Sequence, residues 1–280
     1  NPYLVVRKDA MRIRPIILAQ ILFVFLFMGL LQPLYSEAAS RQRGRTNAPK
    51  IAAGFGHTVA LKSDGTLWAW GAGSNGELGD DAKKGRGEPK RSGTDADWMF
   101  IAVGDQFTTA LKSDGTLWAW GSNSYGQVGD GTIVSKSTPT QIGTDTWASV
   151  ATGYNYTLAV KSDGTLWAWG YNVYGQLATG GTDALPHSIP AQIGADNKWV
   201  SAAGGQYHAV AVKADGTLWA WGRGNYGQLG IFGSLTTKTT PTLRGTDTTW
   251  GAAAAGANHT VVVKADGTLW AWGYNASGQL

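Results

Sequence analysis

Cysteine is absent from this 280-residue sequence, which excludes disulfides, thiolate metal sites and a thiol nucleophile. Histidine is scarce, with four residues in the chain, and charged residues make up only 15%. The sequence also lacks an aspartate-rich calcium loop and a G-x-S-x-G nucleophile elbow. We therefore predict no catalytic residue, no metal site and no cofactor, and we expect that the protein is not an enzyme.

A hydrophobic run long enough to span a membrane is missing as well. The apolar run Ile16–Leu31 has about 16 residues, whereas a spanning helix needs about 20. Arg12 and Arg14 precede the run, and Ser36–Ala38 offers small residues for cleavage after Ala38. This order of charged, apolar and small residues is typical of a secretory signal peptide. An uncleaved membrane anchor is the alternative interpretation.

The N-terminal part therefore divides into short segments. Residues 1–10 precede Met11 and are interpreted as upstream translation, and residues 11–38 are interpreted as the signal peptide. Residues 39–50 form a basic linker before the region 51–280. The protein is predicted to be secreted or held at the cell envelope, with a membrane contact only through an uncleaved signal segment.

Excess positive charge is missing from the region after the linker. The first 50 residues hold eight basic and two acidic residues, so the remaining 230 hold fifteen basic and seventeen acidic ones. A nucleic-acid-binding domain needs a concentrated basic surface. We therefore expect no nucleic-acid partner.

The region 51–280 contains one sequence motif that is repeated five times. The sequence LKSDGTLWAWG occupies 61–71 and 111–121, and close variants occupy 160–170, 212–222 and 263–273. The first tryptophan of each WAW recurs every 49 to 52 residues. A period near fifty is typical of propellers and similar arrays, in which each copy is one supersecondary unit.

Each copy has the local signals of strands and turns. Residues 58–62 and 67–70 favour strands, and the Asp-Gly between them favours a tight hairpin turn. No helical periodicity is found after residue 40. A proline recurs later in each of four copies, and because proline donates no ladder hydrogen bond we expect it at a strand start or in an edge strand. These prolines are Pro89, Pro139, Pro190 and Pro241.

The paired tryptophans are predicted to join neighbouring sheets. Strand alternation places Trp68 and Trp70 on one face and Leu67, Ala69 and Gly71 on the other. A bulky face against a small face suits stacking, and each tryptophan buries roughly 150–250 Å². We therefore assign a structural role to all ten WAW tryptophans: Trp68, Trp70, Trp118, Trp120, Trp167, Trp169, Trp219, Trp221, Trp270 and Trp272.

The segments before WAWG resemble a known family. IAAGFGHTVAL (51–61), AAGGQYHAVAV (202–212) and AAAGANHTVVV (253–263) resemble the repeat signature of the RCC1 family, the regulators of chromosome condensation and their relatives. The resemblance covers residues 51–280 and implies an all-β, seven-bladed β-propeller with four antiparallel strands per blade. About 230 residues supply about four and a half blades of about 50 residues. We therefore expect a C-terminally truncated, open arc with exposed edge strands.

The signature histidine varies between copies. It is present as His57, His208 and His259 but is replaced by Phe107 and Tyr156 in the other two copies. A catalytic or metal-binding histidine would not tolerate these replacements, whereas a packed one could. The histidines are therefore predicted to be structural.

Two glycine-rich segments match a nucleotide-binding pattern. Gly71–Gly76 and Gly222–Gly227 both read G-x-G-x-x-G, but no helix is predicted to follow, as a dinucleotide site requires. The middle glycine alternates with Asn123, Asn172 and Asn275 in the other copies. We therefore predict a turn position with positive φ there.

Function is expected where the copies differ. Tyr125, Tyr174 and Tyr226 precede the Gly-Gln of their loops, and Tyr171 and Tyr274 add aromatic rings nearby. Tyrosine is favoured at binding surfaces because it offers a large contact area at a small entropic cost. These five residues are the candidate partner-binding residues. Packing of the loops against the adjacent blade is the alternative.

Three functions are considered. The first is an exported, monomeric, non-enzymatic module that binds another macromolecule, a protein, through a loop face. The second is a cell-surface protein that binds polysaccharide by stacking tyrosines on sugar rings. The third is guanine-nucleotide exchange, which the resemblance to the RCC1 family implies, but the signal peptide and the near-neutral repeat region argue against it.

Overall fold

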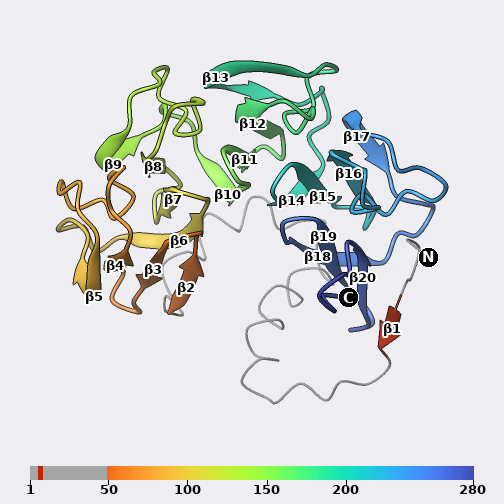
Figure 1. Cartoon of the computed structure of the whole chain (residues 1–280), viewed down its shortest axis with the longest axis horizontal. Helices are drawn as coiled ribbons and strands as arrows, with labels where there is room; N and C mark the ends of the chain where they lie inside the picture. The colour runs from red at the N-terminus through yellow and green to blue at the C-terminus, as the bar shows by residue number, and fades with distance from the viewer. Residues whose placement is uncertain (1–5, 9–48) are drawn as a thin grey trace.

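The computed structural model describes residues 6–8 and 49–280, and every regular element in this part of the chain is a β-strand. The strands form five four-stranded antiparallel sheets, arranged side by side in an arc that is open between the first and the last sheet (Figure 1). The fold is the predicted β-propeller, with one blade for each copy of the repeat. No helix of the described residues is long and apolar enough to cross a membrane.

The strands of a blade follow the sequence order from the centre of the arc to its rim (Figure 1). The first blade comprises β2 (Lys50–Ala53), β3 (His57–Leu61), β4 (Leu67–Gly71) and β5 (Arg86–Arg91). The second comprises β6 (Trp98–Val103), β7 (Phe107–Lys112), β8 (Leu117–Gly121) and β9 (Lys136–Gln141). The third comprises β10 (Trp147–Thr152), β11 (Tyr156–Lys161), β12 (Leu166–Asn172) and β13 (Asp183–Gln192).

The last two blades differ at the rim. The fourth comprises β14 (Trp199–Gly204), β15 (His208–Lys213), β16 (Leu218–Gly222) and β17 (Lys238–Leu243). The fifth comprises β18 (Trp250–Ala255), β19 (His259–Lys264) and β20 (Leu269–Gly273), and its outer place is taken by β1 (Val6–Lys8). The fifth copy of the repeat therefore contributes three strands, β18 to β20, and is the incomplete blade that the length of the region 51–280 predicted. The predicted signal peptide and the linker up to residue 48 lie outside the described residues.

The recurring prolines lie where their chemistry predicts. Pro89, Pro139, Pro190 and Pro241 belong to β5, β9, β13 and β17, each of which is the outermost strand of its blade. An outermost strand pairs on one side only, so a missing N–H donor is tolerated there. The edge-strand prediction is confirmed.

The hydrophobic core lies between neighbouring blades rather than within one. Trp169 of the third blade is fully buried and packs in one cluster with Leu117 and Val128 of the second. Its Nε1 donates a hydrogen bond to the carbonyl of Gln127, also in the second blade, at 3.0 Å. The same bond to the preceding blade recurs for Trp120, Trp221 and Trp272. The second tryptophan of WAW therefore joins two blades in the second to fifth copies.

The first tryptophan of each WAW is held by its own hairpin turn. Trp118 Nε1 donates to Thr116 Oγ1 at 2.9 Å, and this hydroxyl donates to Asp114 Oδ1 at 2.7 Å. Lys112 Nζ lies 4.6 Å from the centre of the Trp118 ring and pairs with Asp95 at 2.7 Å. The bonds from Thr116 lower the pKa of Asp114. The aspartate of the Asp-Gly turn is thus engaged within the turn, and the same tryptophan–threonine–aspartate chain recurs in the other four copies.

Two signature histidines are buried at the joints between blades. His57 Nε2 lies 3.0 Å from Thr108 Oγ1 in the next blade, and His208 Nε2 lies 2.9 Å from Thr260 Oγ1. Each threonine hydroxyl donates its proton to a backbone carbonyl, so it accepts from the histidine and Nε2 carries the hydrogen. Burial lowers the pKa of His57 to about 4 and that of His208 to about 3. Both rings are therefore neutral at physiological pH.

Where Tyr156 replaces the signature histidine in the third blade, the residue that it faces in the fourth blade changes as well. The Tyr156 hydroxyl donates to the carbonyl of His208 at 2.5 Å and lies 3.2 Å from that of Gly205. The residue that corresponds to Thr108 and Thr260 in this blade is Ala209. The longer phenol reaches the backbone directly, so no threonine is needed to accept from it.

A glycine under the signature ring offers a test of this packing. A Cβ atom at Gly153 would lie 1.8 Å from the Tyr156 ring, so we expect Gly153→Ala to lower the free energy of unfolding by at least about 1–3 kcal/mol. Gly87→Ala is the matched control, because a Cβ there meets nothing within 4 Å. Urea denaturation measures both. Equal stability of the two variants would contradict the packing role of the ring.

Candidate functional site

The variable loops of each blade gather at one end of its sheet. Adjacent strands run in opposite directions, so the first-to-second and third-to-fourth loops of a blade lie at the same end. Backbone bonds join these two loops, as from Tyr171 N to Asn155 O at 2.9 Å and from Arg223 N to Tyr207 O at 2.8 Å. We name this end of the blades the loop face.

Three of the predicted binding residues occupy one position in three consecutive blades. The backbone N–H groups of Tyr125, Tyr174 and Tyr226 donate to the side-chain oxygen of the glutamine two residues later, at 2.8 to 2.9 Å. These glutamines are buried, so they hold the turn in place. Tyr125 and Tyr226 are 36% and 38% exposed. The turn thus presents each ring at the surface of the loop face.

The rings contact one another across the blade boundaries. The centroid distance is 4.6 Å from Tyr125 to Tyr171, 6.2 Å from Tyr171 to Tyr207, and 4.9 Å from Tyr207 to Tyr174. Tyr154 adds a ring 5.9 Å from Tyr207. Aromatic pairs at such distances stabilise each other's placement. The rings therefore pack on the adjacent blade and at the same time stay partly exposed, and their role in partner binding stays a prediction.

An arginine extends the series to the last blade. The Arg223 guanidinium lies 5.1 Å from the centre of the Tyr174 ring and 5.0 Å from that of Tyr226. Tyr226 in turn lies 5.2 Å from Tyr274, which is 40% exposed. One set of stacked side chains therefore runs over the second to the fifth blade. We name this set the tyrosine row: Tyr125, Tyr154, Tyr171, Tyr174, Tyr207, Arg223, Tyr226 and Tyr274.

All five tyrosines singled out in the sequence belong to the tyrosine row, but three of its members were missed. Tyr154 and Tyr207 lie in first-to-second loops, next to the signature ring, and Arg223 directly follows a WAWG. Each differs from its counterparts in the other copies. The same criterion of variable loop residues would have found them if it had been applied to both sets of loops.

The inner part of the loop face is almost free of charge. Its only charged residues in the described part of the chain are Asp105 and Arg223. Burial raises the pKa of Asp105, and the nearby Asp105 carboxylate raises that of Tyr154. Burial likewise raises the pKa values of Tyr171 and Tyr207, so their hydroxyls stay protonated. The segments concerned are 54–56, 72–76, 104–106, 122–126, 153–155, 171–175, 205–207, 223–227, 256–258 and 274–278.

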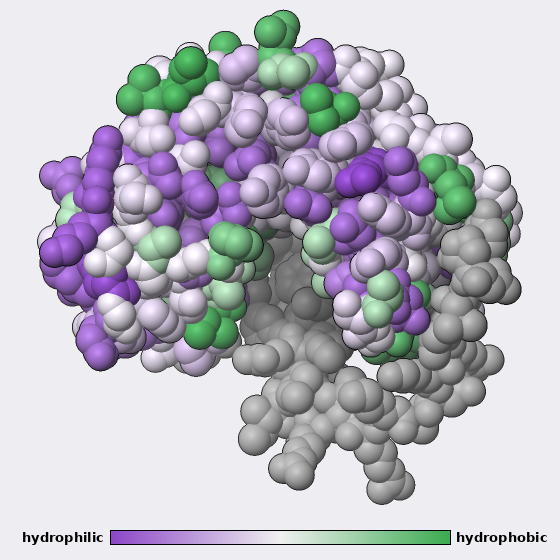
Figure 2. Space-filling model, in the orientation of Figure 1, coloured by the Kyte–Doolittle hydropathy of each residue, from purple (hydrophilic) through white to green (hydrophobic). Residues whose placement is uncertain are grey.

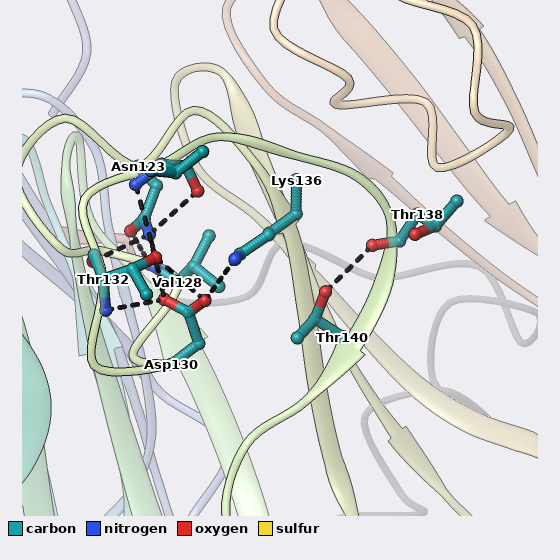
Figure 3. A network of polar contacts seen from close by, with 8 residues as sticks. Asn123, Val128, Asp130, Thr132, Lys136, Thr138 and Thr140 are labelled. Atoms are coloured by element: carbon teal, nitrogen blue, oxygen red, sulfur yellow. Dashed lines mark hydrogen bonds and ion pairs between the residues drawn. The ribbon is translucent and has the colours of Figure 1, made fainter.

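The predicted positive φ beside the tyrosines is wrong. Among the described residues other than glycine, only Asp81 and Ala178 have positive φ. Asn123 is instead fully buried, where its Nδ2 donates to the carbonyl of Thr132 at 2.9 Å and its Oδ1 accepts from the backbone N–H of Val128 at 2.9 Å (Figure 3). Asparagine is thus used at this position for its amide, which ties the loop together.

Glycine occupies the same position for a different reason. A Cβ atom would lie 2.3 Å from the carbonyl oxygen of Lys84 at Gly73, and 2.2 Å from that of Thr236 at Gly224. The backbone approaches too closely for a side chain. In both segments the next regular element is a strand, β5 or β17, so the G-x-G-x-x-G pattern lacks the helix of a dinucleotide site.

Other exposed apolar side chains lie apart from the tyrosine row. In Figure 2 the strongly hydrophobic residues form separate spots, on the outer edge of the arc and beside its opening, with no continuous patch on the visible face. Scattered apolar side chains of this kind are ordinary for a protein surface. Residues of this type in the outer loops and strands are Ile133, Val134, Leu185, Ile189 and Phe232. No group of three or more acidic or histidine side chains in the described chain is placed to hold a metal ion.

Comparison with known families decides the classification. The RCC1-like domain family matches residues 31–280, which is most of the sequence. The chain belongs to the RCC1-like domain family. An RCC1-like propeller is also the fold of the similar solved structures. Human WBSCR16 is 25% identical with a TM-score of 0.72 over 81% of this chain and 62% of that one. Yeast RCC1 (Prp20) in complex with Kap60 is 25% identical with a TM-score of 0.70 over 81% of this chain and 56% of that one.

The curated relatives are similar over a shorter part. The regulator of chromosome condensation of Homo sapiens is 32% identical over 104 residues, which cover 36% of this RCC1-like chain and 25% of the human protein. The ultraviolet-B receptor UVR8 of Arabidopsis thaliana is 38% identical over 99 residues, which cover 34% of this chain and 22% of the receptor. The chain thus matches about a quarter of the length of these relatives.

Proposed function

We propose that this RCC1-like propeller is an exported, non-enzymatic module that binds another protein through the tyrosine row. The observation behind the proposal is the continuity of the row over four blades. Tyrosine and arginine are the residues that dominate binding energy at protein interfaces. Their contacts with one another hold the rings in place before binding, so little side-chain entropy is lost on association.

The comparisons and the sequence support the remaining parts of the proposal. The yeast RCC1 structure contains a bound protein, Kap60, so a protein of similar fold has a protein partner. Export rests on the predicted signal peptide at 11–38. Within the described loop face, the titratable groups beside the tyrosines are Asp105 and Arg223, which do not form a nucleophile with its base.

Affinity capture with the full chain tests the proposal. The immobilised protein is exposed to culture medium and envelope extract of the cells that produce it, and retained material is analysed for both protein and sugar. The variant carries Tyr125→Ser, Tyr174→Ser and Tyr226→Ser, because Ser277 occupies this position in the last blade and shows that the turn accepts serine. Phe232→Ser, at a side chain 70% exposed outside the tyrosine row, is the control.

We expect one protein to be retained in stoichiometric amount by the original chain and the control, and at least about tenfold less by the triple variant. Equal retention by the triple variant would contradict a role of the tyrosine row. Retention of polysaccharide without protein would favour the alternative, a carbohydrate-binding surface protein, for which the repetition of tyrosine in three consecutive blades is the supporting observation.

A further inference from the structure

We propose that the tyrosine row binds an extended, uncharged, proline-rich segment in the polyproline II conformation. This inference rests on the proposed function and names the kind of protein segment that the row takes. It is carried by the charge around the tyrosine row, the tilt of the rings and the tyrosine hydroxyls that can donate hydrogen bonds.

The charge around the tyrosine row favours an uncharged ligand. The inner loops carry one acidic and one basic residue, Asp105 and Arg223, which leaves no net charge. Arg223 is already stacked between Tyr174 and Tyr226. An acidic or basic segment would lose its hydration on this surface without gaining a matching set of charges.

The tilt of the rings favours a ridged ligand over a flat one. Neighbouring rings of the tyrosine row meet at interplanar angles of 45° to 67°, so the rings do not share one flat plane. A sugar ring stacks best on an open, flat aromatic face. Proline-rich segments instead insert their pyrrolidine rings between aromatic side chains, and their preformed helix loses little entropy on binding.

The tyrosine row offers hydrogen-bond donors, which suits a ligand backbone that has acceptors but no donors. Proline has no N–H, so a proline-rich segment presents only carbonyl oxygens. The raised pKa values of Tyr171 and Tyr207 keep their hydroxyls as donors. These two hydroxyls are therefore donors for the carbonyls of an extended segment.

Calorimetric titration of the full chain with an acetylated and amidated decaproline tests the inference. A Gly-Ser peptide of the same length and the hexamer of N-acetylglucosamine are titrated in parallel. The variants are Tyr207→Ala, which removes the ring that contacts three other tyrosines, and Tyr207→Phe, which keeps the ring and removes the hydroxyl. Phe232→Ala is the control, and circular dichroism verifies that each variant is folded.

We expect saturable binding of decaproline that is weakened at least about tenfold by Tyr207→Ala, less by Tyr207→Phe, and not by Phe232→Ala. No binding of decaproline, binding that Tyr207→Ala leaves unchanged, equal binding of the Gly-Ser peptide, or binding of the sugar alone would each overturn the inference. Decaproline is also used as a competitor of the captured protein. If the tyrosine variants lose that protein but decaproline does not displace it, the inference is wrong while the proposed function stands.

Discussion

Trp169→Ala should lower the free energy of unfolding by about 3–5 kcal/mol, the usual cost of removing a fully buried tryptophan. Trp169 is 0% exposed, packs between the second and third blades, and donates a hydrogen bond to Gln127. Its removal leaves a cavity at the joint and takes one of two donors from the Gln127 carbonyl, which still accepts from Thr157 Oγ1 at 2.8 Å. Because blades contact only their neighbours, weakening one joint should loosen the array on both sides. Urea denaturation monitored by circular dichroism measures the loss.

Trp70→Ala is the matched control for this prediction. Trp70 has the same place in the first blade, but no repeat blade precedes it in the described chain and its side chain is only half-buried. The same substitution should therefore cost clearly less there. Equal losses for Trp169→Ala and Trp70→Ala would contradict the role of the tryptophan as a joint between blades, since only Trp169 has a neighbour to join.

Acidification from pH 7 to pH 5 should destabilise the protein strongly through two histidines. Burial lowers the pKa of His57 to about 4 and that of His208 to about 3, against an ordinary value of 6.5. The unfolded chain therefore takes up protons below pH 6.5, whereas the folded chain takes them up only near pH 4 and pH 3. The stability that depends on the neutral rings is full above pH 6.5 and falls as the pH drops. Two histidines should together lose roughly 4 kcal/mol by pH 5, at up to about 1.4 kcal/mol per pH unit each.

The double variant His57→Phe, His208→Phe tests the assignment. Phe107 occupies the same position in the second blade, so a phenylalanine ring fits against the neighbouring glycine. The variant should lose some stability at pH 7, because two hydrogen bonds to threonine disappear, but its stability should change far less between pH 7 and pH 5. Urea denaturation at a series of pH values measures both slopes. An unchanged slope in the double variant would assign the acid sensitivity to other groups.

The local structure of each blade could be predicted because its signals lie close together in sequence. The Asp-Gly turns, the alternation of Trp68 and Trp70 with small residues, and the prolines of the outer strands each act within a few residues of the chain. The local rule failed at Asn123, where a positive φ was expected. The Asn123 side chain instead makes hydrogen bonds to the backbone of Val128 and Thr132, and these groups come together only when the loop is folded.

The sequence by itself determined the repeat, the hairpin within each copy, the joints made by tryptophan, and five of the tyrosines that gather on the loop face. Only the tertiary structure decided that these tyrosines meet one another and that Tyr154, Tyr207 and Arg223 complete the row. The physical reason is the stacking of blades, which brings loops about 50 residues apart to within contact distance. The sequence spacing of two rings does not show whether they touch, because this depends on how each blade is packed against the next.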